Sequence, residues 1–188
     1  MIDIGVVTQP RGPMADPDGY VRVAQAAERL GFGFLNVSDH IVVPPVVGSD
    51  YPYTKDGSLP RPWLKAGQPQ VECFDVLATL AYVAGCTKRL RLLTSALILP
   101  YRQAVIAAKT ITTIDVLSRG RLIVGLAPGW LEEEFVALNA PPFGERGRVT
   151  DEYIDAYKEL WTSPKPTFHG DYVKFGGIAF KPKPFQKP

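Results

Sequence analysis

Residues 90–130 read LRLLTSALILPYRQAVIAAKTITTIDVLSRGRLIVGLAPGW, and this stretch decides the fold. An aliphatic run over 90–99 is followed by a segment in which apolar residues recur every three or four positions, and a second aliphatic run begins at Arg121. Strands buried in a parallel sheet have this near-continuous apolar character, and the helical spacing between them predicts a crossover helix. The stretch therefore predicts a strand–helix–strand unit with two parallel strands.

The same alternation continues on both sides of this unit. Asp16 and Pro17 are typical of a helix start, and Gly31 is typical of a helix exit. The predicted strands are 2–7, 34–38, 90–99 and 121–125, and the predicted helices span 17–30, 74–85, 104–118 and 153–161. The first strand is rich in β-branched residues, which predicts burial on both faces. Repeated βαβ units predict an α/β fold with a parallel sheet.

Two stretches interrupt this alternation. Residues 41–70 are rich in Pro, Gly and Tyr and show no periodicity, which predicts a long active-site loop leaving the second strand. Tyr51, Tyr53 and Trp63 in this loop either contact a substrate or simply pack. Residues 165–188 are predicted to form a hairpin insertion and tail, because His169–Phe180 alternates as a hairpin would, with the expected turn at Gly176-Gly177.

The composition argues against several classes of protein. The 21 basic and 19 acidic residues are interspersed, and the net charge is +2. Because the basic residues are not concentrated in one region, the sequence does not predict a nucleic-acid partner. Cys73 and Cys86 lack a CxxC motif or clustered histidines, so we expect buried free thiols and neither a disulfide nor a metal site. The chain shows neither a signal peptide nor an apolar run long enough to span a membrane, which predicts a cytoplasmic protein.

Chemistry in such a fold is expected where parallel strands end. After the second strand, Asp39-His40 either orients a cofactor and moves a proton, or caps a turn and packs under the loop. In the third strand, small residues at 94–96 permit a bulge or the approach of a flat ligand, with ordinary packing as the alternative. Just past that strand, Tyr101-Arg102 either meets an anionic group or forms a surface ion pair.

The fourth strand runs into a glycine-bearing turn, 125–130, that can let a ring or a phosphate approach the backbone. Trp130 at its end can form one wall for a planar ligand. The three consecutive glutamates that follow, 132–134, are most typical of a solvated first helical turn.

Taken together, these segments resemble the luciferase-like monooxygenase superfamily, most closely its branch of coenzyme F420-dependent oxidoreductases. The resemblance rests on SDHIVVP at 38–44, on 77–100, and on AAKTITTIDVLSRGRLIVGLAPGWLEEEF at 107–135. The order of Arg146-Gly147, 150–153, Trp161, His169-Gly170 and 182–184 in the tail follows the same branch. The family's turn after strand four usually reads G-x-G-x-G-W, and here Ala127 replaces the central glycine and Pro128 follows it.

The resemblance implies a (β/α)8 barrel that binds F420, or alternatively FMN, at the carboxyl ends of its strands. Four predicted core strands are half of the eight in such a barrel, so we expect one incomplete barrel domain over 1–188, either an open four-strand sheet or a truncated fragment, with a β-hairpin insertion after strand four. The implied catalytic residues are His40, as proton donor or acceptor, and Asp39, which would orient it. The implied cofactor-binding residues are Asp39, His40, Ser95, Ala96, Ala127, Pro128, Gly129 and Trp130, with a non-prolyl cis peptide at Ser95-Ala96.

The resemblance also implies the reaction and the assembly. The expected activity is hydride transfer between F420 and a small organic substrate, in a homodimer. The alternatives are an FMN-dependent monooxygenase that uses O2 and, from another class, an inactive flavin-binding remnant or truncated fragment.

Overall fold

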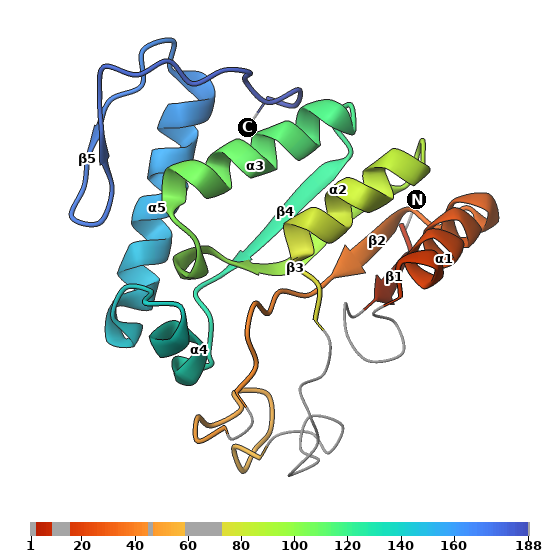
Figure 1. The fold of residues 1–188 in the computed structure, drawn as a ribbon, viewed down its shortest axis with the longest axis horizontal. Coiled ribbons are helices and arrows are strands. Elements are labelled where there is room, and N and C mark those ends of the chain that lie inside the picture. Colours follow the sequence, from red (N-terminus) through yellow and green to blue (C-terminus); the bar gives the residue numbers. More distant parts are fainter. Residues whose placement is uncertain (1–2, 9–15, 45–46, 59–72, 188) are drawn as a thin grey trace.

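Four short strands run parallel to one another in a single sheet, in the order β1–β2–β3–β4 (Figure 1). The computed structural model describes residues 3–8, 16–44, 47–58 and 73–187. The strands are β1 (Gly5–Thr8), β2 (Phe34–Val37), β3 (Arg91–Ile98) and β4 (Leu122–Ala127). The α/β class and the incomplete parallel barrel predicted from the sequence are confirmed.

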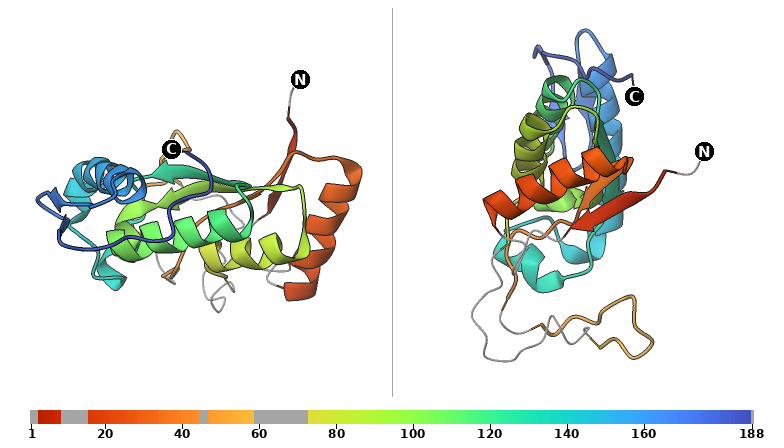
Figure 2. Two further views of the ribbon diagram at one scale, coloured as in Figure 1. Left: turned by 90° about the horizontal axis from the view of Figure 1, so that it is seen from above. Right: turned by 90° about the vertical axis from the view of Figure 1, so that its right-hand side faces the viewer.

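Four helices of more than ten residues connect and follow these strands: α1 (Pro17–Leu30), α2 (Val76–Cys86), α3 (Ala104–Leu117) and α5 (Arg146–Thr162). Shorter elements are the 3-10 turns η3 (Leu99–Tyr101) and η4 (Phe143–Glu145), and helix α4 (Glu132–Ala137). Helix α1 contacts α2, α2 contacts α3, and α3 contacts α5, which places them side by side against the sheet (Figures 1 and 2). Their buried apolar side chains and those of β2, β3 and β4 form the main core.

Both ends of α1 follow the sequence prediction. The carboxylate of Asp16 accepts hydrogen bonds from the backbone N–H groups of Asp18 and Gly19, and Gly31 adopts a left-handed conformation with φ of 81°. The end of α2 differs from the prediction, because the helix continues through Gly85 to Cys86. Its start also differs, since Asp75 caps the helix and leaves Phe74 outside it.

The first strand is less buried than its composition predicts. Strand β1 pairs with β2 alone among the described strands, so it forms an edge of the sheet. The side chain of Val7 is 71% exposed, which shows that the prediction of burial on both faces was wrong for this strand. A run of β-branched residues does not by itself reveal that a strand lies at an edge.

The predicted hairpin is present, but its turn lies elsewhere. Strand β5 (Phe168–His169) pairs antiparallel with β6 (Lys174–Phe175), so the chain reverses over 170–173 and not at Gly176-Gly177. The carboxylate of Glu152 on α5 explains the shift, because it accepts hydrogen bonds from the backbone N–H groups of residues 171, 172 and 173. A contact from a distant helix therefore fixes this turn.

Strands β3 and β4 come unusually close at one point. Their register shifts between Thr94 and Leu97, and the Thr94 hydroxyl donates a hydrogen bond of 2.9 Å to the carbonyl of Gly125. A Cβ atom at position 125 would lie 2.5 Å from the Thr94 carbonyl oxygen. Only glycine fits here without moving backbone.

Replacing Gly125 with Ala is expected to lower the free energy of unfolding by about 1–3 kcal/mol, because the added methyl group must displace β3. Gly85→Ala is the matched control, since a Cβ there has no heavy atom within 4 Å and alanine favours a helix. Urea denaturation of both variants checks this. Equal stability of Gly125→Ala and the wild type would contradict it.

Candidate functional site

A cleft of about 410 Å³ opens where β2, β3 and β4 end. Its walls come from five parts of the chain: Ser38, Asp39 and His40 after β2; Ser95, Ala96, Ile98 and Tyr101 from β3 and η3; Ala127, Pro128, Gly129 and Trp130 at the end of β4; Tyr51, Pro52 and Tyr53 from the long loop; and Arg146 on α5. All eight residues that the sequence singled out as catalytic or cofactor-binding therefore border one cleft. Their roles stay predictions.

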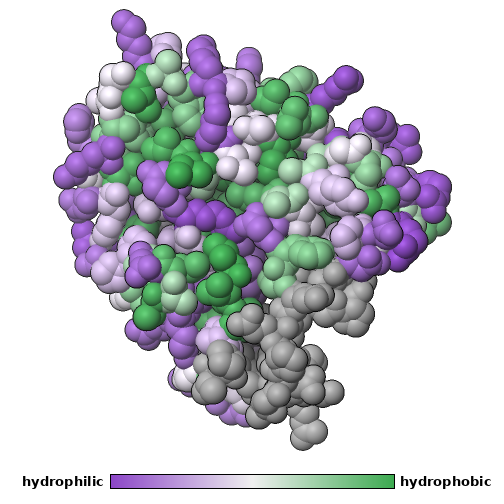
Figure 3. All heavy atoms as spheres, in the orientation of Figure 1, coloured by the Kyte–Doolittle hydropathy of each residue, from purple (hydrophilic) through white to green (hydrophobic). Residues whose placement is uncertain are grey.

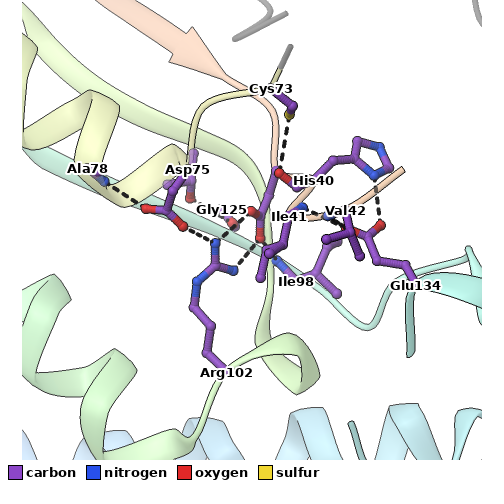
Figure 4. Close-up of polar contacts among 12 residues, drawn as sticks. His40, Ile41, Val42, Cys73, Asp75, Ala78, Ile98, Arg102, Gly125 and Glu134 are labelled. Carbon is purple, nitrogen blue, oxygen red and sulfur yellow. Dashed lines mark hydrogen bonds and ion pairs between the residues drawn. The ribbon is translucent and has the colours of Figure 1, made fainter. Parts of the chain in front are cut away.

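Asp39 joins the end of β2 to the end of β3. Its side chain is fully buried, and one of its oxygens, Oδ2, accepts a hydrogen bond of 2.9 Å from the backbone N–H of Ile98. The guanidinium of Arg102 binds both carboxylate oxygens, at 2.7 and 2.8 Å. The same guanidinium contacts Asp75, the cap of α2, at 2.7 Å (Figure 4). Asp39 thus ties together three elements beneath the cleft.

Arg102 forms a buried ion pair. Its side chain is 13% exposed. Burial acts against its charge, but the hydrogen bonds and charges of Asp39 and Asp75 outweigh burial and raise the pKa of the guanidinium above its ordinary value. Of the two alternatives for this residue, an ion pair is therefore correct, though not at the surface. A fixed, charged Arg102 holds Asp39 in its bidentate geometry.

The imidazole of His40 has a different carboxylate partner from the one expected. Its Nδ1 lies 2.8 Å from Oε2 of Glu134, whose side chain is completely buried (Figure 4). The other oxygen of Glu134 accepts hydrogen bonds from the backbone N–H groups of Ile41 and Val42, at 2.6 and 3.1 Å. Asp39, expected to orient His40, is instead held by Arg102 and Ile98.

Glu134 is the site residue that sequence reasoning missed. The three consecutive glutamates were interpreted as a solvated helical turn, and the structure contradicts this for Glu133 and Glu134. Helix α4 points Glu134 inward beside Phe135 and turns Glu132 toward solvent. A signal for the burial of Glu134 was present, because Glu134 is adjacent to Phe135, an aromatic residue that is buried. The exposed residues of the helix are 132, 136 and 137. This signal is weak in a helix of six residues.

Glu133 holds the long loop against α4. Its carboxylate accepts hydrogen bonds from the backbone N–H groups of Gly48 and Ser49 and from the Ser49 hydroxyl, at 2.5, 3.0 and 2.7 Å. Although partial burial acts in the opposite direction, the hydrogen bonds from Ser49 and Gly48 lower the pKa of this carboxyl below its ordinary value. Two residues further along, the ring of Tyr51 packs edge-on against Trp130 with 5.1 Å between centroids. The loop therefore forms part of the cleft wall.

Several small residues from β3 and from the end of β4 line the cleft, next to the larger side chains of Ile98 and Trp130. The peptide bond between Ser95 and Ala96 is cis, as the resemblance implied. Gly129 adopts φ of 90°, and a Cβ there would lie 2.8 Å from Cγ2 of Ile98. Ala127 and Pro128 border the cleft from β4 and the turn after it. A flat group can approach the backbone of β3 at Ser95 and Ala96, whereas Ile98 and Phe135 fill the space beside Gly129.

Arg146 contributes the one unpaired positive charge among the described residues of the cleft wall. Its Nε donates 3.1 Å to the carbonyl of Gly129 and its Nη1 donates 2.9 Å to the carbonyl of Phe143, while the guanidinium carbon lies 3.9 Å from the Phe143 ring centroid. None of the ion pairs found within the described ranges includes it. The remaining N–H groups of its fork are available to an anion.

One family of known proteins matches almost the whole chain. The sequence model described as luciferase-like monooxygenase matches residues 2–188. The chain belongs to the luciferase-like monooxygenase family. An uncharacterized protein of Mycobacterium tuberculosis H37Rv is 34% identical over 163 residues, which are 87% of this chain and 55% of that protein.

Proteins that are similar to this chain in sequence or in fold differ in their cofactors. An FMNH2-dependent dimethylsulfone monooxygenase of Pseudomonas putida is 38% identical over 106 residues, or 55% of this chain and 29% of that enzyme. The structure of an F420-dependent secondary alcohol dehydrogenase in complex with an F420–acetone adduct superposes with a TM-score of 0.74 at 23% identity, covering 98% of this chain and 50% of the other. The luciferase-like chain spans about half the length of the curated relatives that match most of it.

The sequence also led to predictions for the loop aromatics and the two cysteines of this luciferase-like chain. Tyr51 and Tyr53 border the cleft, while Trp63 lies outside the described residues. The thiols of Cys73 and Cys86 are half-buried, not fully buried as expected, and the Cys73 thiol donates to the carbonyl of His40. No group of three or more His, Cys, Asp or Glu in the described ranges is arranged to hold a metal. Within the same ranges, no helix combines the length and apolar character needed to cross a membrane.

Asp39→Asn is expected to lower the free energy of unfolding by roughly 3 kcal/mol, because it removes a charge from a buried pair and leaves Arg102 undercompensated. Asp75→Asn is the matched control, since the Asp75 side chain is 43% exposed and asparagine also caps helices. That variant should lose under about 1 kcal/mol. Urea midpoints of the two variants measure the difference, and equal losses would show that Asp39 is not the main partner of Arg102.

Proposed function

We propose that this chain is part of an oxidoreductase that binds coenzyme F420 and transfers a hydride between that cofactor and a small organic substrate. One observation carries the proposal. The Asp39-His40 pair, the Ser95-Ala96 bulge and the turn at 127–130 meet at one cleft, at the carboxyl ends of three adjacent parallel strands. Ligands of parallel α/β sheets bind at this edge.

The base of the cleft fits a flat ring. Small side chains at Ser95 and Ala96 leave room for an aromatic face, and Trp130 borders the same cleft. Ala127 and Pro128 make the turn bulkier than the glycine-rich turn of the family, and both still line the cleft. We expect the ring to lie between the bulge and Trp130.

The charges of the cleft suit a ligand with an anionic arm. Asp39 is neutralised by Arg102, and the carboxylate of Glu134 faces His40. Arg146 remains as a cation with unused N–H groups, at the rim formed by Gly129. F420 and FMN both carry phosphate beyond the ring system, and a guanidinium binds phosphate well. Arg146 would hold this part of the cofactor.

The chain's own contribution is orientation and proton transfer. A bound F420 supplies the hydride chemistry. His40 lies on the cleft wall within the same segment as Asp39, and an imidazole there can take a proton from a substrate hydroxyl or return it. Asp39 fixes the backbone on which His40 sits, because its carboxylate is bound to both Ile98 and Arg102.

A second candidate function is an FMN-dependent monooxygenase that uses O2. The relative from Pseudomonas putida named above, an FMNH2-dependent enzyme, favours it. The geometry of the cleft suits either ring, since one fold hosts both chemistries. The Asp39-His40 pair favours F420. A third candidate, a flavin-binding module without activity, would bind a cofactor and show no turnover.

We also propose a cytoplasmic homodimer. Exposed apolar side chains on the outer helices support an interface there, among them Tyr82 on α2 and Ile106 on α3, which are 50% and 67% exposed. Apolar patches appear on the face that carries α2, α3 and α5 (Figure 3). Analytical ultracentrifugation of the wild type, with Ile106→Lys as the disrupting variant, would decide this point.

The proposal is tested by titrating the purified 188-residue chain with F420 and, separately, with FMN while following cofactor fluorescence. Saturable binding of F420 at lower concentration than FMN is expected. Tighter binding of FMN together with oxygen uptake by the reduced complex would favour the monooxygenase. If neither cofactor binds, the chain by itself is not a functional oxidoreductase.

His40→Ala is expected to lower turnover by about 10²- to 10⁴-fold, the range that a positioned general acid or base contributes. Cofactor affinity should change much less, because the ring is held mainly by backbone and by Trp130. His169→Ala is the control, since His169 lies exposed on the hairpin. Single-turnover hydride transfer and fluorescence titration give the two quantities. Turnover that survives in His40→Ala means that His40 moves no proton in the reaction.

A further inference from the structure

The carboxylate of Glu134 is completely buried, and each of its two oxygens has its own hydrogen-bond partners. Its Oε1 accepts from the backbone N–H groups of Ile41 and Val42, and backbone amides can only donate. Its Oε2 lies 2.8 Å from Nδ1 of His40 (Figure 4). The two oxygens are therefore not interchangeable, because the backbone of 41–42 assigns Oε1.

This assignment of the two oxygens determines which ring nitrogen of a neutral His40 carries the proton. An ionised carboxylate accepts and does not donate, so the Nδ1 atom that faces Oε2 has to carry the hydrogen. A neutral imidazole has one N–H and one lone pair, which leaves the lone pair on Nε2. The Nε2 atom is on the part of the ring away from Glu134, and His40 forms part of the cleft wall.

The other charged groups near this pair do not compete for Nδ1. Asp39 is committed to Arg102 and Ile98. Burial, together with the charge of Glu134 and a hydrogen bond to it, raises the pKa of the Tyr101 hydroxyl above its ordinary value, so this phenol stays neutral and donates. Trp130 meets the His40 ring edge-on at 6.5 Å and brings no charge.

We propose that Glu134 is a positioning residue that holds neutral His40 with its proton on Nδ1, so that Nε2 is the atom that receives a proton in the reaction. The catalytic use of this tautomer rests on the proposed function. The tautomer itself does not, because it follows from contacts within the chain. Helix α4 would thus act on the reaction without touching the substrate.

Nitrogen NMR of the histidine rings tests the tautomer directly. The chain has two histidines, and exposed His169 provides the internal reference for an imidazole without a fixed partner. With 15N-labelled histidine, wild-type spectra are recorded over a pH series that reaches the neutral form of both rings. We expect the nitrogen shift of a protonated atom at Nδ1 of His40 and that of a bare atom at Nε2. A neutral His40 protonated at Nε2 would overturn the proposal without any variant.

Glu134→Gln gives a second, sharper outcome. The amide oxygen should stay on the N–H groups of Ile41 and Val42, which turns the amide NH2 toward Nδ1 and forces Nδ1 to accept. The His40 tautomer should then reverse, with the proton on Nε2. Glu133→Gln is the matched control on the same helix, because its carboxylate binds 48–49 and not His40. An unchanged tautomer in a folded Glu134→Gln variant would show that another group sets it.

The reversed tautomer should also appear in kinetics. Where a carboxylate that orients a catalytic histidine is replaced by its amide, the wrong tautomer lowers kcat by about 10⁴-fold. A fall in kcat of at least 10²-fold with little change in KM is expected for Glu134→Gln, and no such fall for His169→Ala on the exposed hairpin. If the cofactor titration fails, the NMR result still decides the tautomer, so the two proposals fail separately.

Discussion

The buried carboxylate of Asp39 is the contact on which the rest of the site depends. It joins the end of β2 to the backbone of Ile98 at the end of β3 and, through Arg102, to the cap of α2. A carboxylate with no exposure is tolerated only when hydrogen bonds and an opposite charge replace its water shell, and all of these are present here. Because this network joins the ends of β2 and β3 to the cap of α2, the cleft edge of the sheet has one geometry.

A second carboxylate acts on the same segment from the opposite side. Glu134 reaches from α4 to the backbone N–H groups of Ile41 and Val42 and to the ring of His40. Two carboxylates thus hold the residues after β2. Asp39 belongs to that segment itself, and Glu134 is 94 positions away from His40 in sequence. Neither anion is free to move, and rigid supports of this kind are what a reacting group requires.

The sequence predicted the parts of this structure that depend on local pattern. Apolar runs located all four parallel strands, and Asp16 and Gly31 correctly predicted both ends of α1. Residues at strand ends were predicted to converge because carboxyl ends of parallel strands share one edge, and they do border one cleft. The predictions that were wrong concern features that depend on contacts between distant residues. The turn of the hairpin is set by Glu152 on α5, and the burial of Glu134 depends on backbone that arrives from β2.

Helix α4 has only six residues, yet consecutive side chains on it have separate tasks: Glu133 holds the loop at 48–49 and Glu134 holds 40–42. Neighbours on a helix are separated by about 100° of rotation, so one added or deleted residue before Glu132 would turn both carboxylates away from their partners. A change that keeps three glutamates in a row would still lose the arrangement. The length of the connection between Trp130 and Glu132 is therefore constrained together with the identities of the two glutamates.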